Sequence, residues 1–156
     1  MPVGQLPATY TLKEHSVSMN VTRRFMDALD TLERYGDVDY IVSLFGELCD
    51  VGNAVSRNAF IGRDGAREYW TTYRAWFREV GSSFHNVIAQ DGRSAIEWSS
   101  TGTSMKGHHV RYEGVSILEF QDDHIQRFRA YFNPEALGRA VATEHLLGDV
   151  YLWPFR

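Results

Sequence analysis

The stretch from Phe84 to Gly102 decides the fold, and it reads FHNVIAQDGRSAIEWSSTG. Apolar and polar residues alternate on both sides of Asp91-Gly92, which is the period of a β-strand. The Asp-Gly pair supplies the positive φ angles that a two-residue hairpin turn requires. The sequence therefore predicts an antiparallel hairpin with strands at 84–90 and 94–102. Counting outward from the turn places Gln90 opposite Arg93, Val87 opposite Ile96 and His85 opposite Trp98.

A second hairpin is expected downstream. The segments 109–120 and 124–132 have strand-like composition and flank Asp122-Asp123. A bulge in either strand would shift the pairing by one residue. Without a bulge, a two-residue turn pairs Leu118 with Arg127, Gly114 with Tyr131 and Tyr112 with Asn133.

Helical periodicity precedes both hairpins. Apolar residues at spacings of three and four predict a first helix from Asn20 to Tyr35, with Gly36 at its end. Asp37 is expected to cap a short second helix that ends at Gly46. These two helices place the start of the folded domain near residue 18.

A third helix carries an aromatic face. Between residues 48 and 62 the irregular pattern predicts a short strand followed by an open loop. Asp64 is a candidate N-cap, and the apolar stripe continues to Gly81. The stripe consists of Ala66, Tyr69, Trp70, Tyr73, Trp76, Phe77 and Val80.

The C-terminal part begins with another helix signal. Asn133 is a candidate N-cap, and Pro134 suits the first helical position because its missing N–H is not needed there. The helix is expected to continue to about Leu147. The apolar tail at 150–155 is too hydrophobic to remain in water, so it should dock, and a neighbouring subunit is one candidate.

This order of elements predicts an α+β fold. We expect a cone-shaped, curved antiparallel sheet covered by three helices, a cystatin-like α+β barrel, followed by the C-terminal helix and the apolar tail. Residues 1–17 are expected to form a loose N-terminal leader, and residues 18–156 a single domain. A small open sheet rarely buries both of its faces alone, so a homodimer through the sheet is the expected assembly.

Composition excludes several classes of protein. The chain has 156 residues, of which 44% are hydrophobic and 23% charged, which is typical of a folded globular domain. No apolar run approaches the roughly 18 residues of a membrane span. The net charge of −4 argues against a nucleic-acid partner. Cys49 is the only cysteine, so an intrachain disulfide is excluded, and without a secretory signal the expected location is cytoplasmic.

Several of these residues together resemble a known family. Gly62 before the aromatic helix, Glu97-Trp98, Glu113-Gly114-Val115 and the block from Arg129 to Pro134 are similar to the nuclear transport factor 2-like superfamily. The similarity is greatest to the SnoaL-like group of polyketide cyclases and ketosteroid isomerase relatives, and it covers roughly residues 18 to 145. This resemblance implies a cone that holds a small hydrophobic ligand and a dimer formed through the sheet.

The chain departs from the family at two acidic positions. Asn133 stands where the family pattern, similar to Arg-x-Tyr-Phe-Asp-Pro, has an aspartate. Asn53 falls where the ketosteroid isomerases have their aspartate base. An asparagine side chain cannot accept a proton at neutral pH, so the ordinary general base is absent from both places.

Three residues are candidates for catalysis. His85 titrates near neutral pH and is counted onto the same face as Trp98, which makes it the best candidate for a proton shuttle. Tyr112 and Tyr131 have hydroxyls that could donate to a carbonyl which becomes an enolate. For all three residues the alternative, which the composition of protein cores favours, is a packed and hydrogen-bonded core residue. The expected ligand-contacting residues are Asn53, Tyr73, Trp98, Ser100 and Asn133.

Other acids and histidines are less suitable. Glu97 and Glu113 are counted onto the face opposite His85, and either would enter the cone only if the register slipped by one residue. His108 and His109 are adjacent on a strand and point to opposite faces, so they cannot share a metal ion. Neither a metal nor a cofactor is predicted, because no ligand spacing or phosphate-binding glycine motif occurs.

These observations favour a cofactor-independent isomerase, cyclase or hydratase/hydrolase that acts on a steroid-like or polyketide-like carbonyl compound. The alternative is a module of the same fold that binds a ligand, or assembles with another protein, without chemistry. The two amides at acidic positions favour the alternative, whereas the aromatic helix and the candidate hydroxyls suit either function.

Overall fold

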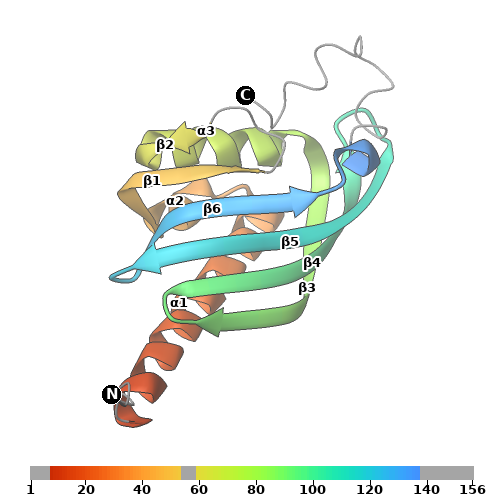
Figure 1. Cartoon of the computed structure of the whole chain (residues 1–156). Helices are drawn as coiled ribbons and strands as arrows, with labels where there is room; N and C mark the ends of the chain where they lie inside the picture. The colour runs from red at the N-terminus through yellow and green to blue at the C-terminus, as the bar shows by residue number, and fades with distance from the viewer. Residues whose placement is uncertain (1–7, 54–58, 138–156) are drawn as a thin grey trace.

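A computed structural model describes residues 8–53 and 59–137 of the chain, and of residues 8–16 it describes only the backbone. A curved six-stranded sheet carries helices on one face (Figure 1). The strands run in the order β2-β1-β6-β5-β4-β3. The elements are α1 (Ala8–Tyr35), α2 (Val38–Ser43), β1 (Phe45–Asn53), β2 (Phe60–Ile61), α3 (Gly62–Ala75), β3 (Phe77–Gln90), β4 (Arg93–Ser104), β5 (His109–Gln121) and β6 (His124–Phe132).

This arrangement confirms the predicted α+β cone. Two details differ from the expected antiparallel barrel. β1 pairs with β6 in parallel, and the sheet does not close because β2 and β3 lie at its two edges. Parallel neighbours need a long connection, which here is supplied by α3 and the two hairpins. The alternation within each strand fixed the hairpins but contains no information on how β1 pairs.

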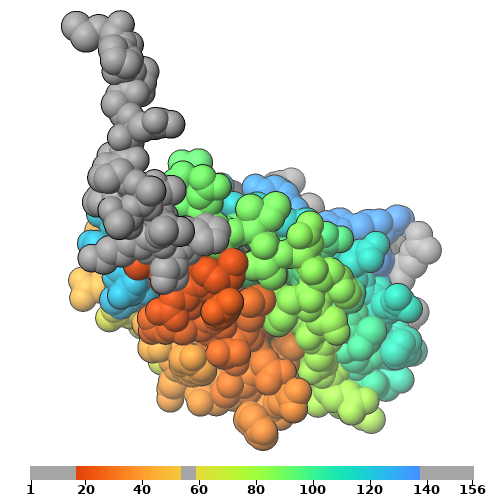
Figure 2. All heavy atoms as spheres, turned by 90° about the horizontal axis from the view of Figure 1, so that it is seen from below, coloured from red at the N-terminus to blue at the C-terminus, as the bar shows by residue number. Residues whose placement is uncertain are grey.

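Helix α1 is longer than predicted. It begins at Ala8 and not at Asn20, so residues 8–17 are helical and do not form a loose leader. Ser18 is buried, and its hydroxyl accepts a hydrogen bond of 3.1 Å from the backbone N–H of Gly92. The helix thus extends along β3 to the turn of the first hairpin (Figure 2). Ser18 and Thr22 are buried polar residues of α1, so the apolar stripe is interrupted at the start of the predicted helix.

The end of the first helix and the start of the second are as predicted. Gly36 has a φ of +73° and its N–H bonds to the carbonyl of Leu32 at 2.9 Å, which is a left-handed helix cap. The Asp37 carboxylate accepts from the N–H of Asp39 at 2.9 Å and so caps α2. α2 ends at Ser43, earlier than predicted, because β1 already begins at Phe45.

The prediction for α3 was wrong at both ends. The helix begins at Gly62, so Asp64 lies in its first turn and is not its cap. It ends at Ala75, and β3 follows at once. A register shift between Phe77 and Glu79 leaves Phe77 and Val80 both buried on β3. Their spacing of three, produced by a bulge, imitates the period of a helix.

The first hairpin is confirmed near its turn and differs further away. Gln90 pairs with Arg93 and Val87 pairs with Ile96, as predicted. A second register shift lies between Phe84 and Asn86, so that Phe84 and not His85 is opposite Trp98. The pairing predicted for His85 was therefore wrong. The bulge turns Phe84 toward the helices and His85 toward the outer face of the sheet.

The second hairpin is also confirmed, with a shift of one residue. An irregularity between Glu119 and Phe120 sets the register of everything beyond it. The predicted pairings of Leu118 with Arg127 and of Gly114 with Tyr131 were wrong. The observed pairs are Leu118 with Phe128, Glu119 with Arg127, Gly114 with Phe132 and Val115 with Tyr131. Tyr112 pairs with Ser100 on β4.

The described chain ends inside the predicted C-terminal helix. Residues 134–137 are helical, and the Asn133 side chain accepts from the N–H of Glu135 at 3.0 Å, which confirms the cap. The continuation of this helix and the apolar tail lie outside the described residues. In the two described ranges, none of the helices has both the length and the hydrophobicity that a bilayer crossing demands.

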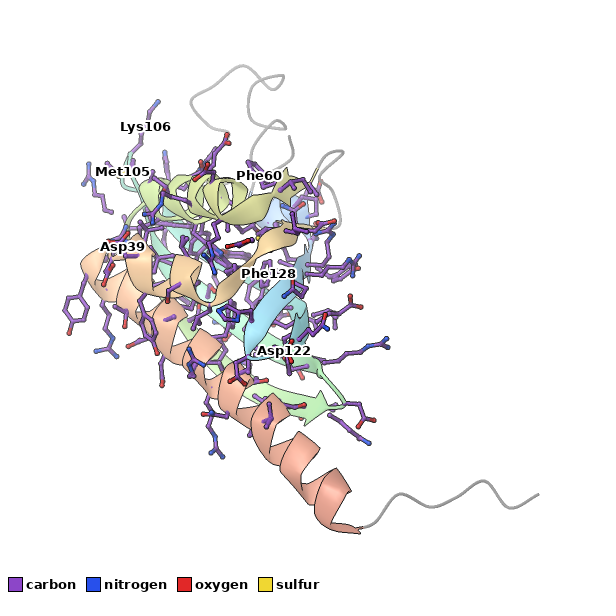
Figure 3. All side chains as sticks on the ribbon, turned by 90° about the vertical axis from the view of Figure 1, so that its left-hand side faces the viewer. Asp39, Phe60, Met105, Lys106, Asp122 and Phe128 are labelled. Atoms are coloured by element: carbon purple, nitrogen blue, oxygen red, sulfur yellow. The ribbon has the colours of Figure 1, made fainter. Side chains whose placement is uncertain are left out.

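The core lies between the helices and the concave face of the sheet. It contains Phe25 and Leu32 from α1, Tyr69 and Trp70 from α3, and Phe128 from β6. Figure 3 shows Phe128 in the interior, whereas Asp39, Lys106 and Asp122 lie on the outside. This core sets the position of the cavity described next.

Candidate functional site

A cavity opens between α1, α3 and the concave face of the sheet. The centre of a water molecule can move through about 40 Å³ of it. Most of its lining is apolar, and its polar groups are mainly hydroxyls. The lining residues are Phe25, Leu29, Tyr69, Trp70, Tyr73, Ser82, Phe84, Ile96, Trp98, Ser100, Tyr112, Ser116, Phe128, Ala130, Phe132 and Leu137.

One part of this lining is an aromatic wall, formed by Phe25, Tyr69, Trp70 and Phe128. The ring of Phe128 lies 5.0 Å from that of Trp70 and 5.5 Å from that of Phe25, and Tyr69 meets Trp70 edge-on at 5.0 Å. These are favourable tilted and edge-to-face distances. The indole N–H of Trp70 is buried without a hydrogen-bond partner among the described residues. The polar groups of the wall are therefore this indole N–H and the Tyr69 hydroxyl.

A second part is a hydroxyl cluster, formed by Tyr73, Ser82, Ser100 and Tyr112. The hydroxyls of Ser82 and Ser100 lie 2.6 Å apart on neighbouring strands. Tyr112 lines the same part of the cavity from β5, where it is the strand partner of Ser100. α3, β3, β4 and β5 each contribute one member, so the cluster depends on the register of three strands.

The carboxylate of Glu33 on α1 lies behind this cluster. Only 3% of Glu33 is exposed. One carboxylate oxygen, Oε1, accepts from the hydroxyls of Tyr73 at 2.7 Å and Ser82 at 2.6 Å. The other, Oε2, accepts from the backbone N–H of Ser82 at 2.9 Å. Three donors suit an ionised carboxylate, which is the acceptor-only form.

Burial changes the acidity of this group of residues. Desolvation raises the pKa of Glu33 above its usual value, although the hydrogen bonds from Ser82 and Tyr73 oppose this effect. Burial likewise raises the pKa of Tyr73 and of Tyr112, so both phenols keep their protons. Within the group, the carboxyl is thus the first to gain or lose a proton as the pH changes.

Trp98 and Gly114 shape the cavity beside the hydroxyl cluster. The indole N–H of Trp98 donates to the Ser116 hydroxyl at 2.9 Å, so the polar atom of this large ring is satisfied. Gly114 lies on the next strand opposite Trp98. A Cβ atom there would lie 2.3 Å from the Tyr131 carbonyl oxygen and 2.8 Å from the Trp98 ring. Only glycine fits this position without a shift of the backbone.

The structure brings together four of the residues that the sequence singled out. Tyr73, Trp98, Ser100 and Tyr112 all line the cavity. Asn53 is buried at the end of β1, but it does not itself line the cavity.

The other three lie elsewhere. His85 is exposed, and its Nε2 lies 2.7 Å from the Ser99 hydroxyl on the outer face of the sheet. Tyr131 is 45% exposed, because the irregularity in the pairing of β5 with β6 turns it outward. Asn133 is exposed and acts as the helix cap. These three residues therefore lie away from the cavity. Phe84 and Phe132, the neighbours of His85 and Tyr131 in the sequence, line it instead.

Glu97 and Glu113 lie on exposed positions of the outer face, away from the cavity as predicted but on the same face as His85. The acid that does lie beside the cavity, Glu33, was missed by sequence reasoning. A signal for it was present, because Phe25, Leu29 and Glu33 follow one another at spacings of four. A glutamate that continues an apolar row of a helix must be buried, and a buried carboxylate needs partners.

No grouping of three or more His, Cys, Asp or Glu side chains suited to a metal ion occurs within residues 8–53 and 59–137. The group beside the cavity, which consists of Glu33, two tyrosines and two serines, contains a single carboxylate. The chemistry available at the cavity is therefore that of hydrogen bonds and proton transfer among hydroxyls and one acid.

Comparison with known proteins gives both a family and a fold. A family model described as a SnoaL-like domain matches residues 22–128. A protein named as a SnoaL-like polyketide cyclase from Jannaschia sp. CCS1 has a similar structure, with a TM-score of 0.74 and 14% identity over 91% of this chain and 100% of that one. Comparison with curated proteins gives no match.

Two further solved structures share the fold at similarly low identity. An NTF2-like protein from Anabaena variabilis ATCC 29413 has a TM-score of 0.70 and 14% identity, and the match covers 83% of this chain and 96% of that one. An LEH-like epoxide hydrolase from M. tuberculosis has a TM-score of 0.66 and 15% identity, covering 83% and 92%. At these identities the likeness extends to the fold alone.

Proposed function

Because the chain belongs to the SnoaL-like domain family, we propose that its cavity binds a small hydrophobic carbonyl compound. The aromatic wall would contact the ring of such a ligand, and the hydroxyl cluster would contact its oxygen. An apolar enclosure with a few converging polar groups is the usual character of a ligand site. The observation that carries the proposal is the buried carboxylate of Glu33 behind the hydroxyls of Tyr73 and Ser82.

The size of the cavity restricts the ligand. The free space of about 40 Å³ is much less than the roughly 300 Å³ at the lower end of common ligand sites. A steroid-sized or polyketide-sized compound would enter only if the lining side chains moved apart. A single six-membered ring requires a smaller rearrangement, so we expect monocyclic compounds to be the smallest useful probes.

The hydroxyl cluster suits chemistry at an oxygen atom. Phenol donors close to a carbonyl stabilise the negative charge that develops when it becomes an enolate, which is the central step of proton-transfer isomerisation and aldol-type cyclisation. Glu33 would hold or release the proton through Tyr73 or Ser82. We therefore propose isomerisation or cyclisation as the reaction. Tyr112, which the sequence already predicted as a donor, would donate to the ligand oxygen.

A non-catalytic binding module is the alternative, and one observation favours it. None of the described residues that line the cavity has a carboxylate or an imidazole. Removal of a proton from carbon needs a base near that carbon. Glu33 reaches the cavity only through hydroxyls, so binding without turnover is consistent with the same geometry.

Ligand titration separates the two functions. Steroid enones, aromatic polyketide mimics and 2-cyclohexen-1-one are titrated while thermal stability is followed, and exchange of their α-protons with deuterium oxide is followed by NMR. The cavity variant is Tyr112→Phe and the matched control is Tyr131→Phe, since Tyr131 lies on the outer face.

For an enzyme we expect stabilisation by ligand together with α-proton exchange, and the exchange should fall in Tyr112→Phe but not in Tyr131→Phe. Stabilisation without exchange indicates the binding module. If no compound of these three classes stabilises the protein, the proposed ligand class is wrong.

We further propose a homodimer formed through the outer face of the sheet. Ile88 on β3 is 62% exposed there, and Tyr131 on β6 is exposed on the same face. Burial of such side chains against a second copy would be favourable. Light scattering should give twice the mass of the chain, and Ile88→Arg should shift the protein toward the monomer. A monomer at all concentrations would contradict this assembly.

A further inference from the structure

Two tryptophan indoles line the cavity, and they differ in how their N–H groups are satisfied. The N–H of Trp98 donates to the Ser116 hydroxyl at 2.9 Å. The N–H of Trp70 is buried, and it has no hydrogen-bond partner in the part of the chain that the structure describes. Only 3% of Trp70 is exposed. A buried N–H without a partner costs free energy, so this indole needs an explanation that packing alone does not give.

The surroundings of Trp70 show where an acceptor can come from. Phenylalanine rings, which have no lone pairs, cover much of the indole, and two tyrosine rings lie nearly perpendicular to it, at 87° and 86°. The rings placed against it are those of Phe25, Phe45, Tyr69, Tyr73 and Phe128. None of them accepts the indole proton. Trp70 also borders the cavity, so a ligand there can supply the acceptor.

The packing of the aromatic wall does not require an indole at position 70. A phenylalanine would provide a ring for the same edge-to-face contacts and would bury no polar atom. The fold therefore gains nothing from the N–H itself. A ligand site is typically apolar with a few polar groups that converge on the ligand, and a donor without a protein partner on the lining fits that description.

A second donor to the cavity is the hydroxyl of Tyr112. The Glu33 carboxylate already receives the protons of Tyr73 and Ser82, so no acceptor in the hydroxyl cluster requires the proton of Tyr112. Burial raises the pKa of Tyr112, so the phenol keeps this proton. Tyr112 can therefore donate to the oxygen of a ligand.

The two donors belong to different parts of the core. Trp70 packs in the cluster that contains Phe128, whereas Tyr112 packs in a second cluster with Trp98. Tyr73 packs against both clusters. A single ligand oxygen would have to bridge from one cluster to the other to meet both donors. Two oxygens on one ring can meet them separately.

We infer that the cavity binds a ring compound with two carbonyl oxygens, a cyclic diketone, in which Nε1 of Trp70 donates to one oxygen and the Tyr112 hydroxyl donates to the other. This inference rests on the proposed function, because it specifies which carbonyl compounds the cavity takes. Trp70 is then the residue that distinguishes a dicarbonyl compound from a monocarbonyl compound.

Cyclohexanone and 1,4-cyclohexanedione are a matched pair of probes. They share a six-membered ring and differ by one carbonyl group. The second carbonyl binds water, so burial in an apolar site without a second donor would favour the ketone. With Trp70 as the donor, we expect the dione to bind about tenfold more tightly than the ketone, measured by calorimetric titration.

The variant Trp70→Phe tests the assignment to this indole. It keeps an aromatic ring in the wall and removes the N–H, so the preference for the dione should disappear or reverse. The affinity for cyclohexanone should change much less. Trp76→Phe is the matched control, because it is the same substitution on a tryptophan that does not line the cavity, and it should keep the preference.

NMR spectroscopy of the ¹⁵N-labelled protein observes the donor directly. The chain has four tryptophans, and the indole signal that is missing in Trp70→Phe belongs to Trp70. The dione should move the proton signal of this indole downfield, as a new hydrogen bond does, and cyclohexanone should move it less. The signal of Trp98 should move little, because its N–H is already bonded to Ser116. Neither probe is aromatic, so ring currents of the ligand do not contribute.

The outcomes distinguish the inference from the proposed function. If the unaltered protein binds cyclohexanone as tightly as the dione, the inference is wrong and the proposed function stands; this measurement needs no variant. A preference that persists in Trp70→Phe or is lost in Trp76→Phe, or a Trp70 signal that the dione leaves in place, also overturns the inference. If neither probe binds, both the proposed function and the inference fail.

Discussion

The aromatic wall and the hydroxyl cluster line the same cavity but differ in what their burial achieves. The wall packs four rings from α1, α3 and β6 against one another, with centroid distances between 5.0 and 6.0 Å. Burial of apolar rings favours the folded state. The cluster buries a carboxyl group, which opposes folding unless its hydrogen bonds compensate.

The difference indicates where stability and function lie. The wall gains from burial directly, whereas the cluster depends on the hydrogen bonds among Glu33, Tyr73, Ser82 and Ser100. The raised pKa of Glu33 shows that its partners do not fully compensate for burial. A buried acid kept at such a cost suits a role in binding or proton transfer more than a role in stability.

The largest effect should come from the wall. Phe128 is fully buried and contacts the rings of Phe25, Phe45, Tyr69 and Trp70. Phe128→Ala should lower the free energy of unfolding by about 3–5 kcal/mol, measured by urea denaturation. The control is Leu48→Ala, since Leu48 is 86% exposed and should matter by less than about 0.5 kcal/mol. Equal losses in the two variants would contradict the packing of the wall.

A smaller effect on stability is expected at Gly114, which lies opposite Trp98 beside the hydroxyl cluster. Gly114→Ala would bring a Cβ to within 2.3 Å of the Tyr131 carbonyl and 2.8 Å of Trp98. We expect a loss of about 1–3 kcal/mol in unfolding free energy, because the backbone must shift. A Cβ on Gly81 would meet no atom within 4 Å, so Gly81→Ala is the matched control and should be close to neutral. If Gly114→Ala leaves the unfolding free energy unchanged, the register of β5 described above is wrong.

The buried carboxyl of Glu33 should be visible in the pH dependence of the unfolding free energy. Because the folded protein binds the proton of Glu33 more tightly than the unfolded chain, this group stabilises the fold most below its ordinary pKa of 4.5. That contribution is lost as the pH rises through the raised pKa, with a slope of at most about 1.4 kcal/mol per pH unit. As the pH rises, the unfolding free energy of Glu33→Gln should therefore increase relative to that of the unaltered protein.

Denaturation series at several pH values provide this measurement. Glu113→Gln is the control, because Glu113 is exposed on the outer face, and it should leave the pH dependence of the unaltered protein in place. A constant difference between Glu33→Gln and the unaltered protein across the series would show that Glu33 does not titrate differently in the folded and unfolded states.

The elements of the sheet were predictable because their signals are local. Asp91-Gly92 fixed the first hairpin, and the pairing of Val87 with Ile96 followed by counting. The register failed beyond the shift between Phe84 and Asn86, since the alternation of residue types does not show which residue is left unpaired. The same limit applies to the second hairpin, where one irregularity near Phe120 moved Tyr131 outward.

The site was predictable only in part for the same physical reason. Tyr73, Ser100 and Tyr112 were identified, but their shared partner was not, because Glu33 lies 40 residues from Tyr73 and 49 from Ser82 in the sequence. Contacts at that separation depend on tertiary packing. The two amides, Asn53 and Asn133, drew attention to the acids that the family has and away from the acid that this chain has.

The smallest effect concerns Phe84 and His85, the neighbours at the second register shift of β3. Phe84 lines the cavity beside the hydroxyl cluster, whereas His85 bonds to Ser99 on the outer face. His85→Ala should change the unfolding free energy by less than about 0.5 kcal/mol and leave the affinity for 2-cyclohexen-1-one unchanged. Phe84→Ala, its matched partner, should weaken that affinity because it removes a lining ring. The reverse result, with His85→Ala weakening binding and Phe84→Ala neutral, would mean that the hairpin is regular and that the histidine faces the cavity, as simple counting from the turn implies.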